Sequence, residues 1–327
     1  MPRSAVLTGP GSVELVELPS APLVPGSARV AIEGCGVCGS NLPVWEGRPW
    51  FDYPLPPGNP GHEAWGRVLE GPGEGQRVAL LAESAFSDEL VVPTDRLVVL
   101  PAELAGSPFP GEAIGCALNS ALRSDLQPGQ TVAVVGVGFL GALLVALAAQ
   151  AGARVVAVAR KPSALRLARA MGAAETVLLD DHQRVIDEVA ELTGGAFCER
   201  VLEVTGAAWP LDLSGELTGV GGRLVIAGFH QDGLRSVDVQ LWNWRGIDVV
   251  NAHERDPAVQ LRGIREAVDA VASGRLDPRP LYTHLMPLTE LTTAMDAAAT
   301  RPDGFVKALV VNDLRLGGAD TPCDSPT

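Results

Sequence analysis

The chain has 327 residues, with 39 acidic side chains against 25 lysines and arginines, so its net charge is −14 at pH 7. This charge argues against nucleic acid or an anionic membrane as a partner, because both repel an acidic protein. No apolar run approaches the roughly 20 residues of a membrane-spanning helix, and the first residues do not read as a signal peptide. The length suggests about two domains, and the five scattered cysteines predict reduced thiols in a cytoplasmic protein.

Residues 3–101 are predicted to be mostly β-structure. Short apolar and β-branched runs alternate with clusters of proline and glycine, which favours a small antiparallel barrel or sandwich over helices. The predicted strands include Ser12–Leu18, Ala28–Glu33, Ala64–Leu69, Arg77–Leu81 and Glu89–Val92.

Two turns in this β-region carry residue types that bind metals. A glycine-rich turn presents Cys38 and Ser40, and a later turn presents His62 and Glu63. A thiolate, an imidazole and a carboxylate are donors of an open zinc site, which leaves a further position for water or substrate. Cys35 and Cys38 are alternatively half of a structural zinc site or a redox pair, although no second pair at this spacing completes a four-cysteine site.

Residues 101–130 form a connection with a helical core. Apolar residues recur at helical spacing from Glu112 to Arg123, and a Pro-Gly pair ends the pattern. Glu112 at the start of this helix favours the helix dipole, and Cys116 reads as a small buried hydrophobe. Either side chain could instead turn toward a metal.

The centre of the chain is a βαβ unit. A buried strand is followed by a turn with Gly136, Gly138 and Gly141, an alanine-rich helix and a second buried strand. The first glycine permits the tight turn, the second lets a pyrophosphate approach the backbone, and the third lets the helix pack closely. With the N–H groups of the helix start at Phe139 and Leu140, these glycines predict a dinucleotide site. The alternative is a glycine-rich turn that binds nothing.

The alternation of strands and helices continues to about residue 255, and six strands in total fit a doubly wound parallel sheet of the α/β Rossmann type. Ser163 is the expected N-cap of the next helix. The predicted helices are 164–170 and 185–192, and the further strands are 176–179, 200–204, 223–227 and 247–250.

The end of the second strand of the βαβ unit indicates which nicotinamide cofactor fits. An acid that binds the ribose 2′-hydroxyl is expected about 20 residues past the glycines. Ala159 occupies this position and is followed by Arg160 and Lys161. A neutral residue leaves room for a 2′-phosphate that two cations would pair with, so NADP(H) is favoured over NAD(H). Thr205, which follows the strand 200–204, is a further candidate cofactor contact.

The pattern changes again after residue 255. Asp256 is the expected N-cap of a helix over 257–274, and a second helix is predicted over 288–300. A closing strand follows at 305–311, and the composition of 318–327 predicts a disordered tail.

Together these motifs resemble the zinc-dependent alcohol dehydrogenase type of the medium-chain dehydrogenase/reductase superfamily. The resemblance covers about residues 5–312. It depends on the turn with Cys38 and Ser40, the Gly-His62-Glu63 sequence, the three spaced glycines, and a Gly-Gly-Arg sequence before a strand. Their order along the chain makes the match more specific than any one of them.

The resemblance implies two domains. A mostly β, GroES-like catalytic domain would comprise residues 1–123 and 256–327, and a Rossmann domain would comprise 124–255. It also implies that Rossmann sheets of two copies pair through strands near 223–251. We therefore expect a homodimer or a homotetramer.

The resemblance also assigns roles within one catalytic zinc site. Cys38 and His62 would be ligands, whereas the residue matching Glu63 is a ligand in some members and outer-shell in others. The remaining ligand comes from the connection before the Rossmann domain, where Glu112 and Cys116 both lie close to the expected position. The choice between these two stays open.

The implied mechanism is Lewis-acid catalysis of hydride transfer. Zinc would lower the pKa of an alcohol or polarise a carbonyl, and Ser40 matches the hydroxyl that passes the proton to a relay. Three departures from the family pattern bear on this expectation. The segment from Glu63 to the strand at Arg77 is too short for the four-cysteine structural zinc lobe, Pro43 stands where many members have a relay histidine, and Asn41 replaces a common aspartate.

The function expected from sequence is a zinc-dependent alcohol dehydrogenase or ketone reductase that uses NADP(H) and acts on a small polyol, sugar or specialised metabolite. One alternative is a zinc-free enone or quinone reductase of the same superfamily. Another is an NADPH-binding protein without catalysis. The combination of Cys38, His62 and Glu63 weighs against both alternatives.

Overall fold

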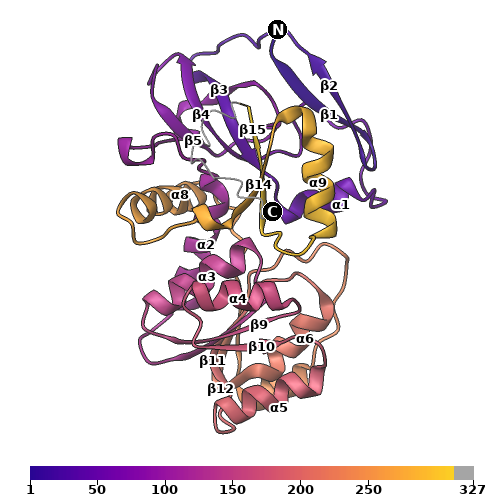
Figure 1. Cartoon of the computed structure of the whole chain (residues 1–327), viewed down its shortest axis with the longest axis vertical. Coiled ribbons are helices and arrows are strands. Elements are labelled where there is room, and N and C mark those ends of the chain that lie inside the picture. The colour runs from indigo at the N-terminus through magenta and orange to yellow at the C-terminus, as the bar shows by residue number, and fades with distance from the viewer. Residues whose placement is uncertain (313–327) are drawn as a thin grey trace, which may run out of the picture.

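The computed structural model describes residues 1–312, so the predicted tail at 318–327 and Cys323 lie outside the described part of the chain. Figure 1 shows a mostly antiparallel sheet in the upper half of the molecule and a parallel sheet in the lower half. We call these the antiparallel-sheet half (β1–β7, β14 and β15) and the parallel-sheet half (β8–β13). The predicted fold class, a Rossmann-type parallel sheet with a mostly β domain, is confirmed.

The parallel sheet has six strands in the order β10-β9-β8-β11-β12-β13. Every neighbouring pair is parallel. The chain builds outward from β8 to β10 and then returns to β11 beside β8. Such a reversal opens a crevice at the carboxyl ends of the two central strands, where ligands bind in sheets of this kind. The strands are β8 (Thr131–Val135), β9 (Arg154–Ala159), β10 (Glu175–Leu178), β11 (Cys198–Glu203), β12 (Thr218–Ile226) and β13 (Asp248–Asn251).

Two helices of this half lie outside the predicted set. Helix α6 contains Pro210 and Gly215, which read as helix breakers in the sequence, and α7 spans only seven residues. The expectation that Ser163 caps a helix is wrong: the N-cap is Lys161, because Pro162 occupies the first helical turn. The helices are α3 (Phe139–Gln150), α4 (Pro162–Ala170), α5 (His182–Leu192), α6 (Ala208–Leu217) and α7 (Val239–Arg245).

The antiparallel-sheet half is completed by the returning end of the described chain. In its main sheet the order is β14-β15-β3-β4-β5-β7, with β6 also paired to β3, while β1 and β2 form a separate pair. The last strand, β15, therefore lies beside β3, which leads into the turn with Cys38. The strands are β1 (Arg3–Gly9), β2 (Ser12–Glu17), β3 (Ser27–Gly36), β4 (Glu63–Glu70), β5 (Arg77–Leu80), β6 (Glu89–Pro93), β7 (Leu97–Val99), β14 (Tyr282–Met286) and β15 (Lys307–Val311).

Helices α2 and α8 pack between the two sheets, and one apolar core runs through them from Trp65 to Leu144. A Cβ at Gly115 of α2 would lie 2.8 Å from the backbone nitrogen of Ile264 in α8, so the two helices approach closely at this point. Within the described residues no helix is long and apolar enough to cross a membrane. The helices of this half are α1 (Leu42–Trp45), α2 (Gly111–Ser124), α8 (Pro257–Ala272) and α9 (Leu291–Thr300).

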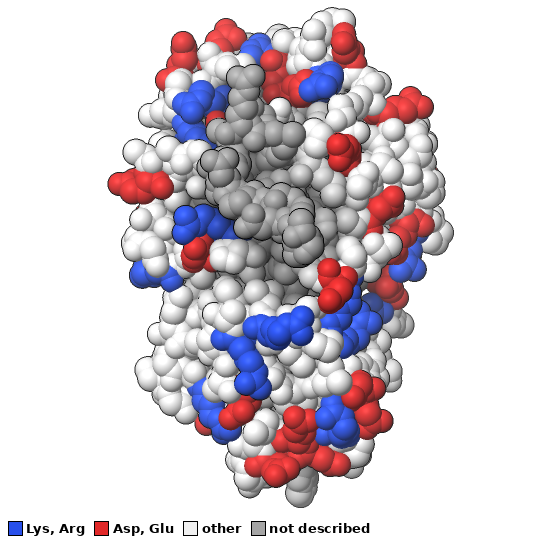
Figure 2. Space-filling view, in the orientation of Figure 1, with Lys and Arg blue, Asp and Glu red and all other residues white. Residues whose placement is uncertain are grey.

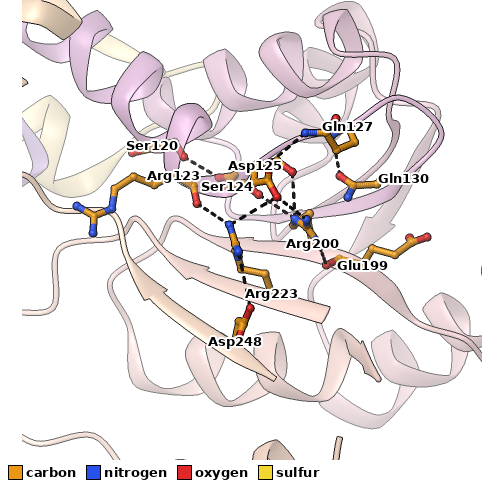
Figure 3. A network of polar contacts seen from close by, with 10 residues as sticks. All are labelled: Ser120, Arg123, Ser124, Asp125, Gln127, Gln130, Glu199, Arg200, Arg223 and Asp248. Carbon is orange, nitrogen blue, oxygen red and sulfur yellow. Dashed lines mark hydrogen bonds and ion pairs between the residues drawn. The ribbon is translucent and has the colours of Figure 1, made fainter. Parts of the chain in front are cut away.

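A polar network fastens the end of α2 to the parallel sheet (Figure 3). Asp125 ends the helix in a left-handed conformation, with φ of 51°. Arg200 donates to the carbonyl of Ser124 at 2.8 Å and pairs with Asp125 at 3.2 Å. Arg223 lies 3.9 Å from Asp125 and 3.7 Å from Asp248. These contacts gather where β11 and β13 begin, so they hold α2 at the sheet edge opposite the crevice.

Candidate functional site

Three side chains of types that can bind metals lie together where β3 and β4 pair. One ligand atom from each of Cys38, His62 and Glu63 lies within 4.8 Å of the other two. Strand β3 ends at Gly36, two residues before Cys38, and β4 begins at Glu63. Gly36 and Glu63 are partners in the antiparallel register of the two strands, so sheet pairing brings the two turns together.

The imidazole of His62 is oriented by the backbone. Its Nδ1 lies 2.8 Å from the carbonyl oxygen of Pro60, and because a carbonyl can only accept, Nδ1 carries the proton. Its Nε2 is thereby left as the ring atom that can bind a metal once it loses its proton, and it lies 3.5 Å from Oγ of Ser40. Asn41 links the two turns, since its side chain donates to Pro60 O at 3.0 Å and accepts from Cys38 N–H at 2.9 Å. Such supporting hydrogen bonds are typical of metal-binding histidines.

The surrounding donors favour positive charge at this place. Burial lowers the pKa of His62, but the Cys38 thiol, together with Glu112 and Glu63, outweighs burial and raises the pKa to about 11. Burial, with the nearby carboxylate of Glu63, raises the pKa of Glu112, although His62 opposes this shift. Acidic groups packed together out of water accommodate a cation among them more readily than a further negative charge.

Lys307 holds the carboxylate of Glu63 and was absent from the residues predicted from sequence. Its Nζ lies 2.7 Å from Oε1 and 2.5 Å from Oε2 of Glu63, with side-chain exposures of 6% for the lysine and 1% for the glutamate. The same Nζ lies 4.9 Å from the centre of the Phe139 ring at the start of α3. A Cβ at Gly36 would lie 1.9 Å from Glu63 Oε2, so the carboxylate requires glycine there. A single lysine within the apolar run 305–311 was the signal in the sequence.

The residues present fit a zinc ion. Thiolate, imidazole and carboxylate form a donor set that zinc uses in proteins. The carboxylate of Glu63 is buried beside Lys307, and because each carboxylate oxygen has two lone pairs it retains acceptor capacity. Together with the imidazole of His62 and the thiol of Cys38, it provides converging donor atoms from two turns.

Glu112 and Cys116 lie on one face of α2, next to these donors. The Cys116 thiol donates to Oε1 of Glu112 at 3.2 Å, as expected for residues one helical turn apart. Burial raises the pKa of the Cys116 thiol, and the Glu112 carboxylate raises it further. Neither residue belongs to the group of donor atoms within 4.8 Å, so the structure does not choose between them as a further ligand.

Each glycine of the turn after β8 has a different environment. Gly136 has φ of 103°, and a Cβ there would lie 2.7 Å from Cγ2 of Thr205. A Cβ at Gly141 would lie 1.9 Å from the carbonyl oxygen of Gly136, so α3 packs directly on the turn. No atom lies within 4 Å of a Cβ placed at Gly138, the N-cap of α3. A tight turn, a close helix and an open N-terminus fit the pyrophosphate of a dinucleotide.

Thr205 faces this turn and is positioned by Glu203, a carboxylate with no exposed side-chain surface at the end of β11. Oε1 of Glu203 accepts from the backbone N–H groups of Thr205 at 2.6 Å and Gly206 at 3.0 Å, and from the Thr205 hydroxyl. Oε2 lies 2.9 Å from Nε2 of His230, whose Nδ1 accepts from Arg235 at 3.1 Å. Thr205 was predicted from the sequence, whereas the buried Glu203 that holds it was not.

Arg160 and Lys161 follow β9, one strand away from the glycine turn. The backbone N–H of Gly136 donates to the carbonyl of Val158 in β9 at 2.9 Å, which places the two strand ends side by side. Lys161 donates to the carbonyl of Arg301, the residue that ends α9. A cavity of about 480 Å³ lies at this place and is lined by Leu42, Arg160, Lys161, Ala299, Thr300 and Arg301.

Comparison with known proteins gives a consistent result. Residues 140–267 match the family model of zinc-binding dehydrogenases. The chain is 25% identical to an alcohol dehydrogenase of Cupriavidus necator, over 95% of this chain and 98% of that protein. It is 26% identical to the erythritol/L-threitol dehydrogenase of Mycolicibacterium smegmatis, over 94% of this chain and 97% of that protein. A solved structure from Sinorhizobium meliloti, described as a zinc-binding dehydrogenase and bound to NADP, has a TM-score of 0.80 at 27% identity, over 95% of this chain and 99% of that one.

Proposed function

Because the chain is a zinc-type, alcohol dehydrogenase-like protein of the medium-chain dehydrogenase/reductase superfamily, we propose that it is a zinc-dependent oxidoreductase using NADP(H). It transfers a hydride between this cofactor and the hydroxyl or carbonyl group of a small polyol, sugar or specialised metabolite. The observation that carries the proposal is the convergence of Cys38, His62 and Glu63 within 4.8 Å. Relatives that act on alcohols and on a four-carbon polyol, by their names, support the substrate class.

In this proposal Cys38, His62 and Glu63 hold the zinc ion, with Glu112 or Cys116 as the remaining donor. Bound zinc supplies Lewis acidity, which lowers the pKa of an alcohol and polarises a carbonyl. The hydrogen bond from Nδ1 to the Pro60 carbonyl keeps His62 in the tautomer and orientation that ligation requires.

Ser40 handles the substrate proton. Its hydroxyl lies 3.5 Å from Nε2 of His62, on the side of the site where the donors converge. When an alcohol is oxidised, its hydroxyl accepts the substrate proton as it passes its own proton on, and the two transfers reverse when a carbonyl is reduced. Pro43, buried in α1, has no group that could take the proton further. The proton therefore leaves Ser40 through water.

Residues at the carboxyl edge of the parallel sheet would hold the cofactor. Gly136, Gly138 and Gly141 shape the pyrophosphate site, with N–H groups from the first turn of α3, at Phe139 and Leu140. Thr205 forms the facing wall of this site. Arg160 and Lys161 pair with the 2′-phosphate, which favours NADP(H). A nicotinamide held there would supply the hydride chemistry at C4.

Metal content tests the proposal. Mass spectrometry of the purified protein should find about one zinc per chain, and Cys38→Ala should remove it together with activity on alcohols and ketones. Cys198→Ala, which removes a buried thiol in β11 of the parallel sheet, is the matched control and should retain the metal. A zinc-free parent that reduces enones or quinones would support the metal-free reductase instead. A parent that binds NADPH but turns over no alcohol, ketone, enone or quinone would support a non-catalytic binding protein.

Two further parts of the proposal concern assembly and location. Strand β13 ends the described sheet order and its first two residues are exposed, so two copies can pair there to form a dimer or tetramer. Light scattering on the purified chain tests this.

The state of the cysteines supports a location in a reducing cytoplasm. The described part of the chain has four free thiols: Cys35, Cys38, Cys116 and Cys198.

A further inference from the structure

The cavity at the end of β9 lies where the two halves of the molecule meet. Its lining comes from the turn after β9, the start of α1 and the C-terminal end of α9: Leu42, Arg160, Lys161, Ala299, Thr300 and Arg301. In Figure 2 basic side chains lie along the boundary between the upper and lower parts of the molecule. Of the three cations that line the cavity, Arg160 and Lys161 belong to the parallel-sheet half and Arg301 to the antiparallel-sheet half.

These three cations lack carboxylate partners. Within residues 1–312, none of Arg160, Lys161 and Arg301 has a carboxylate oxygen within 4.0 Å. The carboxylate of Asp303, two residues beyond Arg301, accepts a hydrogen bond from Ser163 at 2.5 Å instead. Arg184 of α5, in contrast, pairs with both Asp180 and Glu188. Unpaired like charges around a cavity favour an anionic ligand.

The backbone directs Arg301 into this region. Arg301 ends α9 in a left-handed conformation with φ of 47°. Its Nη2 lies 4.0 Å from where a Cβ of Gly39 would stand, so the guanidinium approaches the turn that carries Cys38. The hydrogen bond from Lys161 to the Arg301 carbonyl joins α9 to the turn after β9. Partial burial, with the charge of Arg160, lowers the pKa of Arg301, in keeping with two guanidinium groups close together.

We infer that Arg301 is a third cation of the 2′-phosphate site and a determinant of the preference for NADP(H). The inference rests on the proposed function. A 2′-phosphate carries three acceptor oxygens, and guanidinium groups bind such oxygens in pairs. Because Arg301 lies in the antiparallel-sheet half, the phosphate of NADP(H) contacts both halves of the molecule, whereas NAD(H) lacks this contact.

Binding of two small nucleotides by the full-length protein tests the inference without reference to turnover or zinc. The probes are 2′,5′-ADP and 5′-AMP, which differ only by the 2′-phosphate, and calorimetry measures their dissociation constants. Arg301→Asn should raise the dissociation constant of 2′,5′-ADP by at least about tenfold, because a charge-assisted contact is lost. It should change the dissociation constant of 5′-AMP by less than about twofold. Asparagine is chosen because it tolerates a positive φ, and Arg301→Lys should recover part of the loss.

Arg166→Ala is the matched control, since Arg166 is an exposed arginine on α4 outside the cavity lining. It should leave both dissociation constants within about twofold of the parent. If Arg160→Ala weakens 2′,5′-ADP but Arg301→Asn does not, the inference is overturned while the cofactor preference stands. If the parent binds 2′,5′-ADP no better than 5′-AMP, the proposed preference itself fails. Equal weakening of both probes by Arg301→Asn would assign the residue a structural role and overturn the inference.

Discussion

The donor group of Cys38, His62 and Glu63 and the cavity at the end of β9 differ in whether their charged side chains have protein partners. Among the donors Cys38, His62 and Glu63, two side chains already have a protein partner: Lys307 for Glu63 and the Pro60 carbonyl for His62. In the cavity three cations come together, and among the described residues no carboxylate oxygen lies within 4.0 Å of their side-chain nitrogens. The first region is organised before anything binds, whereas the second depends on its ligand for charge balance. Geometry therefore dominates in one site and electrostatic attraction in the other.

The largest expected effect comes from breaking the buried ion pair between Lys307 and Glu63. Lys307→Met should lower the free energy of unfolding by about 3–5 kcal/mol, because the carboxylate of Glu63 stays buried without its partner. Urea denaturation measures this loss. The double variant Glu63→Gln/Lys307→Met is the control and should recover most of the stability. A loss just as large in the double variant would show that packing around Lys307, rather than its charge, stabilises the site.

A second prediction concerns the buried carboxylate of Glu112. The pKa of Glu112 is raised above 4.5 in the folded protein by burial, so the folded state binds the proton more tightly than the unfolded chain. The contribution of Glu112 to the stability of the metal-free protein is therefore lost as pH rises above 4.5, because the buried side chain must then ionise. Glu112→Gln should stabilise the metal-free protein at pH 7, and this gain should disappear below pH 4.5 in thermal unfolding.

The same variant decides the zinc ligand. If Glu112 is the remaining donor, Glu112→Gln should weaken zinc binding by at least about tenfold, whereas Cys116→Ala should change it little. The reverse order would assign the ligand to Cys116. Competition with a chelator of known affinity measures both constants, and small effects of both variants would exclude both residues.

The smallest expected effect sharpens the contrast between the two regions. Raising the salt concentration from 0.05 to about 0.5 M should weaken the binding of NADPH severalfold more than the binding of NADH, because the salt screens the cations of the cavity. Zinc bound by Cys38 and its neighbours should be nearly insensitive to the same change. Fluorescence titration of the two cofactors measures the difference. Equal salt dependence for NADPH and NADH would show that the cations do not contact a 2′-phosphate.

Much of the architecture was predictable from local patterns. The spaced glycines between two β-branched runs predicted the βαβ unit. The periodicity of apolar residues, with the positions of proline and glycine, located most strands and helices within a few residues. Helices α6 and α7 and strand β14 were missed, because proline, glycine or short length hides their periodicity. Tertiary packing stabilises such elements in spite of weak local preference.

For the site, the sequence by itself determined the donor types and the glycine turn, because these depend on residue identity and on positions close together in the chain. Only the tertiary structure brought Lys307 to Glu63, 244 residues away in the sequence, and placed Arg301 beside Lys161, 140 residues away. The same applies to Glu203, whose role depends on His230 arriving from the segment after β12. Contacts across such separations follow from strand pairing and helix packing, and no local pattern encodes which side chains they join.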